Sequence, residues 1–258
     1  MTGILIGDFL IVLFIFIRVL SMIFTAPVLG DAVIPATVKV FLSISIAYIT
    51  FLTIDKTKIV VDVNIIAIAI NVLKEVLTGA IMGTMLNFVF YGISYAGTLI
   101  GFDMGLMFAQ VLNPMQGTNE NVIGDVISYG AIMVFIMLNG HHYLISAVVA
   151  SFNFIPIAKY TITGPLLLLV LKYSFAVFTI AVKIASPILV SFFLIHIAEG
   201  IIARVIPNIQ VFFISQPAKL AIGFAFLSSL IPIYIYIIKN LLSNFETQLQ
   251  EIIKAMSV

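Results

Sequence analysis

Histidine and carboxylate side chains are the groups in this chain that could bind a metal ion or transfer a proton. His141 and His142 are adjacent, whereas a helical zinc site of the H-E-x-x-H type needs histidines four residues apart and a third ligand. Glu199 follows His196 by three residues, but no second histidine or carboxylate cluster lies near this pair in the sequence. We therefore interpret both pairs as polar contacts and predict no metal site.

Nucleophilic and phosphate-binding chemistry also lack their usual residues. The chain has no cysteine, which removes thiol nucleophiles, thiolate ligands and disulfides. Residues 92–96 contain the first glycine and the serine of a G-x-S-x-G elbow but not its second glycine, and no run matches a phosphate loop or a dinucleotide fingerprint. The sequence therefore predicts no catalytic residue and no cofactor, and nothing in it supports an enzymatic function.

The composition is that of a membrane protein. Hydrophobic residues make up 62% of the 258 residues and charged residues only 9%, whereas a soluble domain carries roughly 25% charged residues. Such a surface must face lipid or other apolar protein. Because 12 Lys and Arg nearly balance 11 Asp and Glu, the charge gives no reason to expect nucleic acid as a partner. We predict an all-α fold of hydrophobic, membrane-type helices.

Six apolar segments are long enough to cross a bilayer, which takes roughly 20 residues. Three of them are too long for a straight span, so each is expected to be a tilted helix, a broken helix or a hairpin. Pro187 predicts a kink in the fifth segment, and the polar residues 139–142 predict a tight turn within the fourth. The segments cover about 4–29, 33–54, 64–100, 122–154, 164–200 and 209–239.

These segments predict one hydrophobic helical domain over residues 1–239. The first segment has no Lys or Arg before it and no clear cleavage site, so we expect it to be retained. Residues 240–258 alternate apolar and polar positions with a helical period, which predicts an amphipathic tail. We expect this tail to lie on the bilayer or on a partner.

Five of the charged residues inside or beside the apolar segments are Arg18, Lys74, Glu75, Glu199 and Arg204. An unpaired Arg18 would cost at least about 2.5 kcal/mol in the membrane, so we expect it either to reach an interface or to contact a group within or between subunits. Lys74 and Glu75 are adjacent, and Glu199 and Arg204 are five residues apart. On a straight helix the two side chains of each pair point in different directions, so they do not form an ion pair with each other. The sequence predicts structural ion pairs or subunit contacts for all five, with proton or ion conduction as the alternative for the last four.

Small residues mark where helices could approach closely. Gly79 and Gly83 form a small-xxx-small pair, and Gly92, Ala96 and Gly97 continue the pattern along the same segment. The absence of large side chains lets two helix backbones come together. We expect close helix packing at these positions.

The connection over residues 101–120 is unusual for a membrane protein. Its first half is too apolar for an exposed loop, and its second half is too rich in Gly, Pro and Asn for a helix facing lipid. Irregular backbone at membrane depth is tolerated where protein buries it or a water-filled cavity lies beside it. An ordinary interfacial loop is the alternative.

Four stretches of the sequence carry a resemblance to a known family. The runs Gly-Leu-x-Phe-Ala-Gln and Asn-Gly-His-His are the most specific, and the four stretches follow the family's order along most of the chain. The chain resembles the FliR family, the flagellar biosynthetic export-gate subunit, and its counterparts in virulence type III secretion. The matching residues are 18–30 with 34–39; 105–111 with 113–114 and 117–118; 138–142; and 187–212.

The resemblance implies a subunit that assembles with FliP-like and FliQ-like partners into a helical cone in the bacterial inner membrane, at the flagellar basal body. It implies bent helical hairpins, an FlhB-like switch protein around the closed gate, and unfolded proteins as the substrates. It also implies that a loop at about 104–120 forms a plug in the channel. The plug residues by this resemblance are Met104, Gly105, Leu106, Met107, Phe108, Pro114, Met115 and Gly117.

The sequence is thus interpreted as a protein export-gate subunit that catalyses no covalent chemistry. A small-solute transporter is the main alternative, and it predicts inverted repeats, of which we find none that is convincing. An intramembrane hydrolase is a third. The sequence leaves open whether the system is flagellar or an injectisome.

Overall fold

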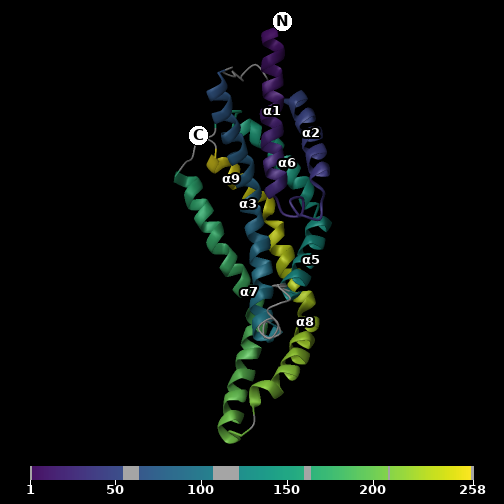
Figure 1. Cartoon of the computed structure of the whole chain (residues 1–258), viewed down its shortest axis with the longest axis vertical. Coiled ribbons are helices and arrows are strands. Elements are labelled where there is room, and N and C mark those ends of the chain that lie inside the picture. The colour runs from purple at the N-terminus through teal and green to yellow at the C-terminus, as the bar shows by residue number, and fades with distance from the viewer. Residues whose placement is uncertain (1, 55–63, 107–121, 160–163, 209, 257–258) are drawn as a thin grey trace. The chain divides into compact units, whose positions relative to one another are not determined.

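The computed structural model describes residues 2–54, 64–106, 122–159, 164–208 and 210–256, and every regular element in these ranges is a helix (Figure 1). The predicted all-α fold of hydrophobic helices is therefore confirmed. The helices are α1 (Thr2–Thr25), α2 (Ala36–Thr53), α3 (Ile65–Asp103), α5 (Val122–Met137), α6 (Gly140–Phe154), α7 (Gly164–Val205), α8 (Val211–Ser243) and α9 (Phe245–Met256).

Five helices are long and apolar enough to cross a membrane, or up to six spans if the bent pair α5 and α6 counts as one. With 39 residues in α3 and 42 in α7, these two helices are roughly 60 Å long, about twice the hydrocarbon thickness. Both are therefore longer than an upright span requires, as the sequence predicted.

A fixed turn joins α1 to α2. The helix ends at Thr25, before Pro27, and Val28 has a positive φ of 66°. From α2, the buried Lys39 Nζ donates hydrogen bonds to the carbonyls of Gly30 and Asp31 at 2.9 and 2.8 Å. The first helix is therefore shorter than the predicted segment 4–29.

The predicted break in the fourth segment is confirmed as a bent helix pair. Asn139 has a left-handed φ of 56° between α5 and α6. The next residue must be small, because a Cβ on Gly140 would overlap the ring of Phe135. These two residues end one helix and begin the next.

Pro187 lies inside α7, which continues through it to Val205. Proline removes the N–H that would bond the carbonyl four residues earlier, here that of Lys183. Ser186 Oγ donates to that carbonyl at 3.1 Å and so satisfies it. The helix ends two residues before Pro207, later than the sequence indicated.

Contacts divide the chain into two compact units. Unit 1 comprises Met1–Phe88, Phe135–Ser174 and Leu242–Val258, and its core is built on the buried face of α1. Unit 2 comprises Val89–Val134 and Phe175–Leu241. Its core includes the second half of α3 and the middle of α7, with Ile93, Ile100, Met104, Ile184, Ile188 and Phe192 fully buried.

The amphipathic helix α9 packs on α6 within unit 1. Its apolar residues Leu249, Ile252, Ile253 and Met256 are buried in this chain. We expected the tail on the bilayer or on a partner, and the structure instead places its apolar face against the chain's own helices. Glu251 on the same helix pairs with Lys172 of α7 at 3.7 Å.

Large apolar side chains also remain exposed along most helices. Phe41 of α2, Met137 of α5 and Phe175 of α7 are each more than two-thirds exposed. Soluble monomers rarely carry apolar patches of this extent. These faces suit lipid or partner chains.

Candidate functional site

Arg18 of α1 is the centre of a buried polar cluster in unit 1, here called the Arg18 cluster. Its Nε and Nη2 donate to the two carboxylate oxygens of Glu75 on α3, at 2.6 and 3.1 Å, and both side chains are fully buried. Its Nη1 donates to Ser151 Oγ at 3.1 Å and to the carbonyl of Ile155 at 3.0 Å. The ring of Phe152 stacks 4.1 Å from the guanidinium carbon.

The cluster extends to the segment that follows α6. Glu75 Oε1 accepts a hydrogen bond from the backbone N–H of Ala158 at 2.9 Å, and Lys74 Nζ donates to the carbonyl of Ala158 at 3.2 Å. Ala158 has a positive backbone φ of 67°, which is uncommon for a residue other than glycine. The hydrogen bonds with Lys74 and Glu75 hold the backbone in this conformation. Lys74 and Glu75 thus do not pair with each other, and both hold the same turn.

Every charge in the Arg18 cluster has a partner inside the chain. A bidentate arginine–carboxylate pair is among the strongest and most directional polar contacts in proteins. Removing one member would leave the other as an unpaired buried charge. The arrangement joins α1, α3 and the end of α6, and it leaves no free charge at Arg18 for snorkelling to an interface.

Two glycines let α3 approach α1 closely enough for this pairing. Glu75, Gly79 and Gly83 are spaced four residues apart and lie on one face of α3. A Cβ on Gly79 would overlap Ser21 and the carbonyl of Arg18, and one on Gly83 would overlap Thr25. Their small size therefore sets the distance between the helices, as small-xxx-small pairs do in membranes.

The later small residues of α3 make similar approaches within unit 2. A Cβ on Gly92 would come within 2.9 Å of Ile180 on α7, and one on Gly97 would overlap Gly124 on α5. Ala96 is fully buried in the same region. Close helix packing at the small residues of α3 is therefore present in both units.

A second charged group, here called the Glu199 cluster, lies in unit 2. Lys219 of α8, 95% buried, places Nζ 2.7 Å from Glu199 Oε2 on α7. Ser215 also hydrogen-bonds Glu199, whereas the other carboxylate oxygen, Oε1, has no hydrogen-bond partner among the described residues. Asp103, the last residue of α3, lies within electrostatic reach of His196 and Lys219.

The beginning of the predicted plug segment packs on α8 beside the Glu199 cluster. Met104 is fully buried, and a Cβ on Gly223 would meet its side chain at 2.6 Å. Gly105 has φ +82°, a backbone conformation that favours glycine, and a Cβ there would overlap Gln216. These two close contacts therefore hold Met104 and Gly105 against α8.

The remaining predicted site residues lie at the following places in the structure. Leu106 is the last described residue of the segment, and Arg204 is exposed in the last turn of α7. Glu199 pairs with Lys219 rather than with a residue of its own helix. Five predicted plug residues lie outside the described part of the chain: Met107, Phe108, Pro114, Met115 and Gly117.

Sequence reasoning missed three members of these clusters. Lys219 stands in an apolar segment as Arg18 does, so the same criterion would have found it. Asp103 ends the third helix and is the only acid for many residues around it, which was a usable signal. Ser151 gave no signal, because an isolated serine in a helix usually bonds its own backbone.

Within the described ranges, no group of three or more His, Asp or Glu side chains could hold a metal ion. The rings of His141 and His142 lie 4.2 Å apart, centre to centre, at the start of α6. His141 is partly buried and His142 is exposed. Two neighbouring imidazoles without a third ligand do not make a zinc site.

Comparison with known proteins identifies relatives along almost the whole chain. Residues 9–245 match the family described as bacterial export proteins, family 1. The chain is 29% identical to the flagellar biosynthetic protein FliR of Bacillus subtilis over 235 residues, 90% of each chain. It is 28% identical to FliR of Escherichia coli over 240 residues, 93% of this chain and 91% of the relative. It is 30% identical to FliR of Buchnera aphidicola (strain APS) over 228 residues, 88% of each.

Proposed function

The chain belongs to the FliR family within the bacterial export proteins, family 1, and we propose that it is a subunit of the gate through which unfolded flagellar proteins cross the inner membrane. The family is one of flagellar export proteins and is not known for enzymes. The observation that carries the proposal is the family match over residues 9–245, which includes both buried charge clusters. Helices apolar enough to cross a membrane support the location.

We propose that the gate is completed by FliP-like and FliQ-like subunits and an FlhB-like switch protein. The exposed apolar faces of α2, α5 and α7 support this, because a chain with so much uncovered apolar surface needs lipid or protein around it. The test is extraction of the tagged chain from native membranes in mild detergent, followed by mass spectrometry of the proteins that co-purify. Recovery of a single monodisperse chain without such subunits would contradict the proposal.

We also propose that the loop at about 104–120 closes the channel. A passage wide enough for an unfolded polypeptide would leak ions when idle, and a hydrophobic constriction prevents this by excluding water. Leu106, Met107 and Phe108 supply apolar bulk, and the flexible thioether of methionine adapts to irregular gaps. The packing of Met104 and Gly105 on α8 supports the idea, because a plug needs a fixed attachment.

The plug proposal is tested by removing apolar bulk from an assembled gate. Deletion of residues 106–116, or replacement of Leu106, Met107 and Phe108 by glycine, should leave the complex assembled and make cells leaky to small ions and dyes. The matched control keeps the bulk, with Leu106→Met, Met107→Leu and Phe108→Leu, and should stay sealed. Unchanged membrane conductance in the glycine variant would place the seal in another subunit.

A further inference from the structure

Lys183 is an exposed cation near the middle of α7. Its backbone carbonyl accepts a hydrogen bond from Ser186, but its ammonium forms no hydrogen bond or ion pair with the described residues. No acid stands three or four positions away along the helix, where ion pairs form. By contrast, five other basic side chains of the helices contact an acceptor inside the chain: Arg18, Lys39, Lys74, Lys172 and Lys219.

The face of α7 that carries Lys183 is rich in large apolar side chains. Val190, Leu194 and Ile197 follow Lys183 by seven, eleven and fourteen residues, so they lie on its side of the helix. Val190 and Leu194 are each 62% exposed, and Phe175, eight residues before Lys183, is 68% exposed. Apolar side chains of this size suit lipid or another apolar helix, and they argue against a water-filled channel along this face.

Lipid alone does not satisfy this face. Lys183 is 19 residues from Gly164 and 22 from Val205, or roughly 28–33 Å from the ends of α7. An unpaired ammonium inside the hydrocarbon is costly, and a lysine can reach the interface only near the end of a span. Placing Lys183 at the interface instead would push one half of α7 out of the hydrocarbon, which is about 30 Å thick, with its exposed apolar side chains in water. Both placements leave a cost that a protein partner would remove.

We propose that a helix of a partner subunit packs on this face of α7 and pairs an aspartate or glutamate side chain with Lys183. The inference rests on the proposed function, because it requires the chain to work among other gate subunits. A carboxylate is the acceptor that neutralises the ammonium, and the carbonyls within a helix are already hydrogen-bonded. The partner is therefore an apolar helix with one acid at the level of Lys183, flanked by side chains that cover Phe175 and Val190.

The test measures the yield of monodisperse complex after co-expression with the partner subunits. Lys183→Met would leave the partner's carboxylate buried and unpaired, so it should lower the yield at least about ten-fold, whereas Lys183→Arg should keep most of it. Lys172→Met is the matched control, because the partner of Lys172 is Glu251 of the same chain. Wild-type yield from Lys183→Met, with the partner subunits still present, would overturn this pairing alone. Absence of partner subunits around the wild-type chain would contradict the proposed function and this pairing with it.

A second measurement identifies the partner residue directly. A membrane-permeant carbodiimide joins an amine to a carboxylate in contact with it through an amide bond. In the purified wild-type complex, mass spectrometry of peptides should find Lys183 joined to an acid of another subunit, and Lys183→Arg should lack this link. The 3.7 Å pair of Lys172 and Glu251 provides the internal positive control. Recovery of the control link without one from Lys183, or a link from Lys183 to an acid of this chain, would overturn the proposal.

Discussion

The Arg18 cluster predicts how much stability a single buried ion pair controls. Arg18→Met removes all four hydrogen bonds that the guanidinium donates and leaves Glu75 as a buried carboxylate with only the Ala158 N–H. Loss of one partner from such a pair costs about 3–5 kcal/mol. Glu75→Met should cost a similar amount, because it leaves the guanidinium charged and buried.

The double variant Arg18→Met/Glu75→Met separates this effect from simple loss of contacts. It removes both charges, and the polar groups left unpaired are the carbonyl of Ile155 and the N–H of Ala158, at about 1–3 kcal/mol each. Its cost of about 2–6 kcal/mol is smaller than the sum of the two single substitutions, about 6–10 kcal/mol. We therefore expect the double variant to lose less stability than the two single variants lose together.

The assay is the yield of monodisperse complex after co-expression with the partner subunits, followed by a temperature series with size-exclusion chromatography. Lys172→Met is the control, because its pair with Glu251 is 65% and 48% exposed, and exposed pairs contribute only about 0–1 kcal/mol. We expect the control to match the wild type and Arg18→Met to lose most of the complex. If Arg18→Met were as stable as the control, the argument from burial and pairing would be wrong.

Three further predictions use the same co-expression assay. Glu199→Lys or Lys219→Glu alone should lower the yield of complex. The double exchange should restore much of that yield, because the 2.7 Å pair is then re-formed with reversed charges. If the double exchange did not raise the yield, loss of this ion pair would not be the cause of the low yield. Gly79→Leu should abolish assembly by driving α3 away from α1, whereas Gly200→Leu, which meets open space, should not; equal yields would contradict the close packing. Gly105→Ala should lower the stability of the complex by about 1–2 kcal/mol, because alanine is strained at a positive φ, and its Cβ would also clash with α8. Assembled complexes of this variant should leak more dye than the wild type. A stable variant that does not leak would show that Gly105 has no part in closing the gate.

Local sequence patterns were sufficient to predict the helical architecture. Hydropathy located the segments that form α1 to α8, and the polar residues around Asn139 marked the break between α5 and α6. Each of these features depends on residues close together in the chain, which is why pattern alone was enough.

The pairing of charges could not be predicted in this way. Arg18 and Glu75 are 57 residues apart in sequence, and Glu199 was an equally good candidate partner by type. The choice depends on the close approach that Gly79 allows between α1 and α3. Sequence predicted a kink at Pro187, and α7 continues through this residue as one helix in which Ser186 satisfies the carbonyl that proline leaves free.

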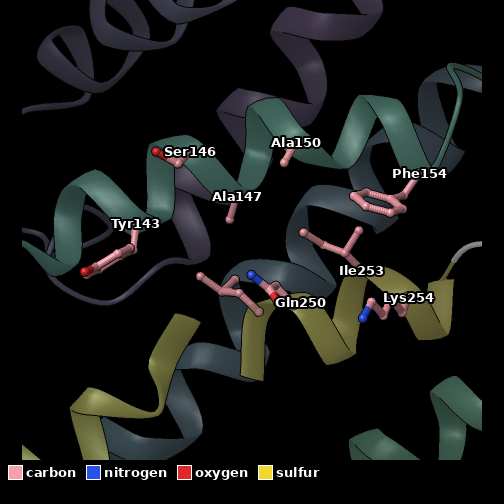
Figure 2. A pocket seen from close by; sticks show the side chains of 9 residues that line it. Tyr143, Ser146, Ala147, Ala150, Phe154, Gln250, Ile253 and Lys254 are labelled. Atoms are coloured by element: carbon pink, nitrogen blue, oxygen red, sulfur yellow. The ribbon is translucent and has the colours of Figure 1, made fainter. Parts of the chain in front are cut away.

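The amphipathic tail shows the same limit. Its periodicity predicts an apolar face but does not identify the surface that covers that face. The structure places it on α6, where the short side chains of Ala147 and Ala150 leave an open groove (Figure 2). That arrangement depends on side-chain sizes in two segments about 100 residues apart in the chain.

The most direct test of the export role is secretion by cells that lack this chain. The gene is deleted in frame, and flagellar proteins are measured in the culture medium and in the cytoplasm, with and without a plasmid copy of the wild-type chain. We predict that secretion of flagellar proteins stops, that the proteins still accumulate inside the cell, and that the plasmid copy restores secretion. Normal secretion in the deletion strain would contradict the assignment of this chain to the export gate.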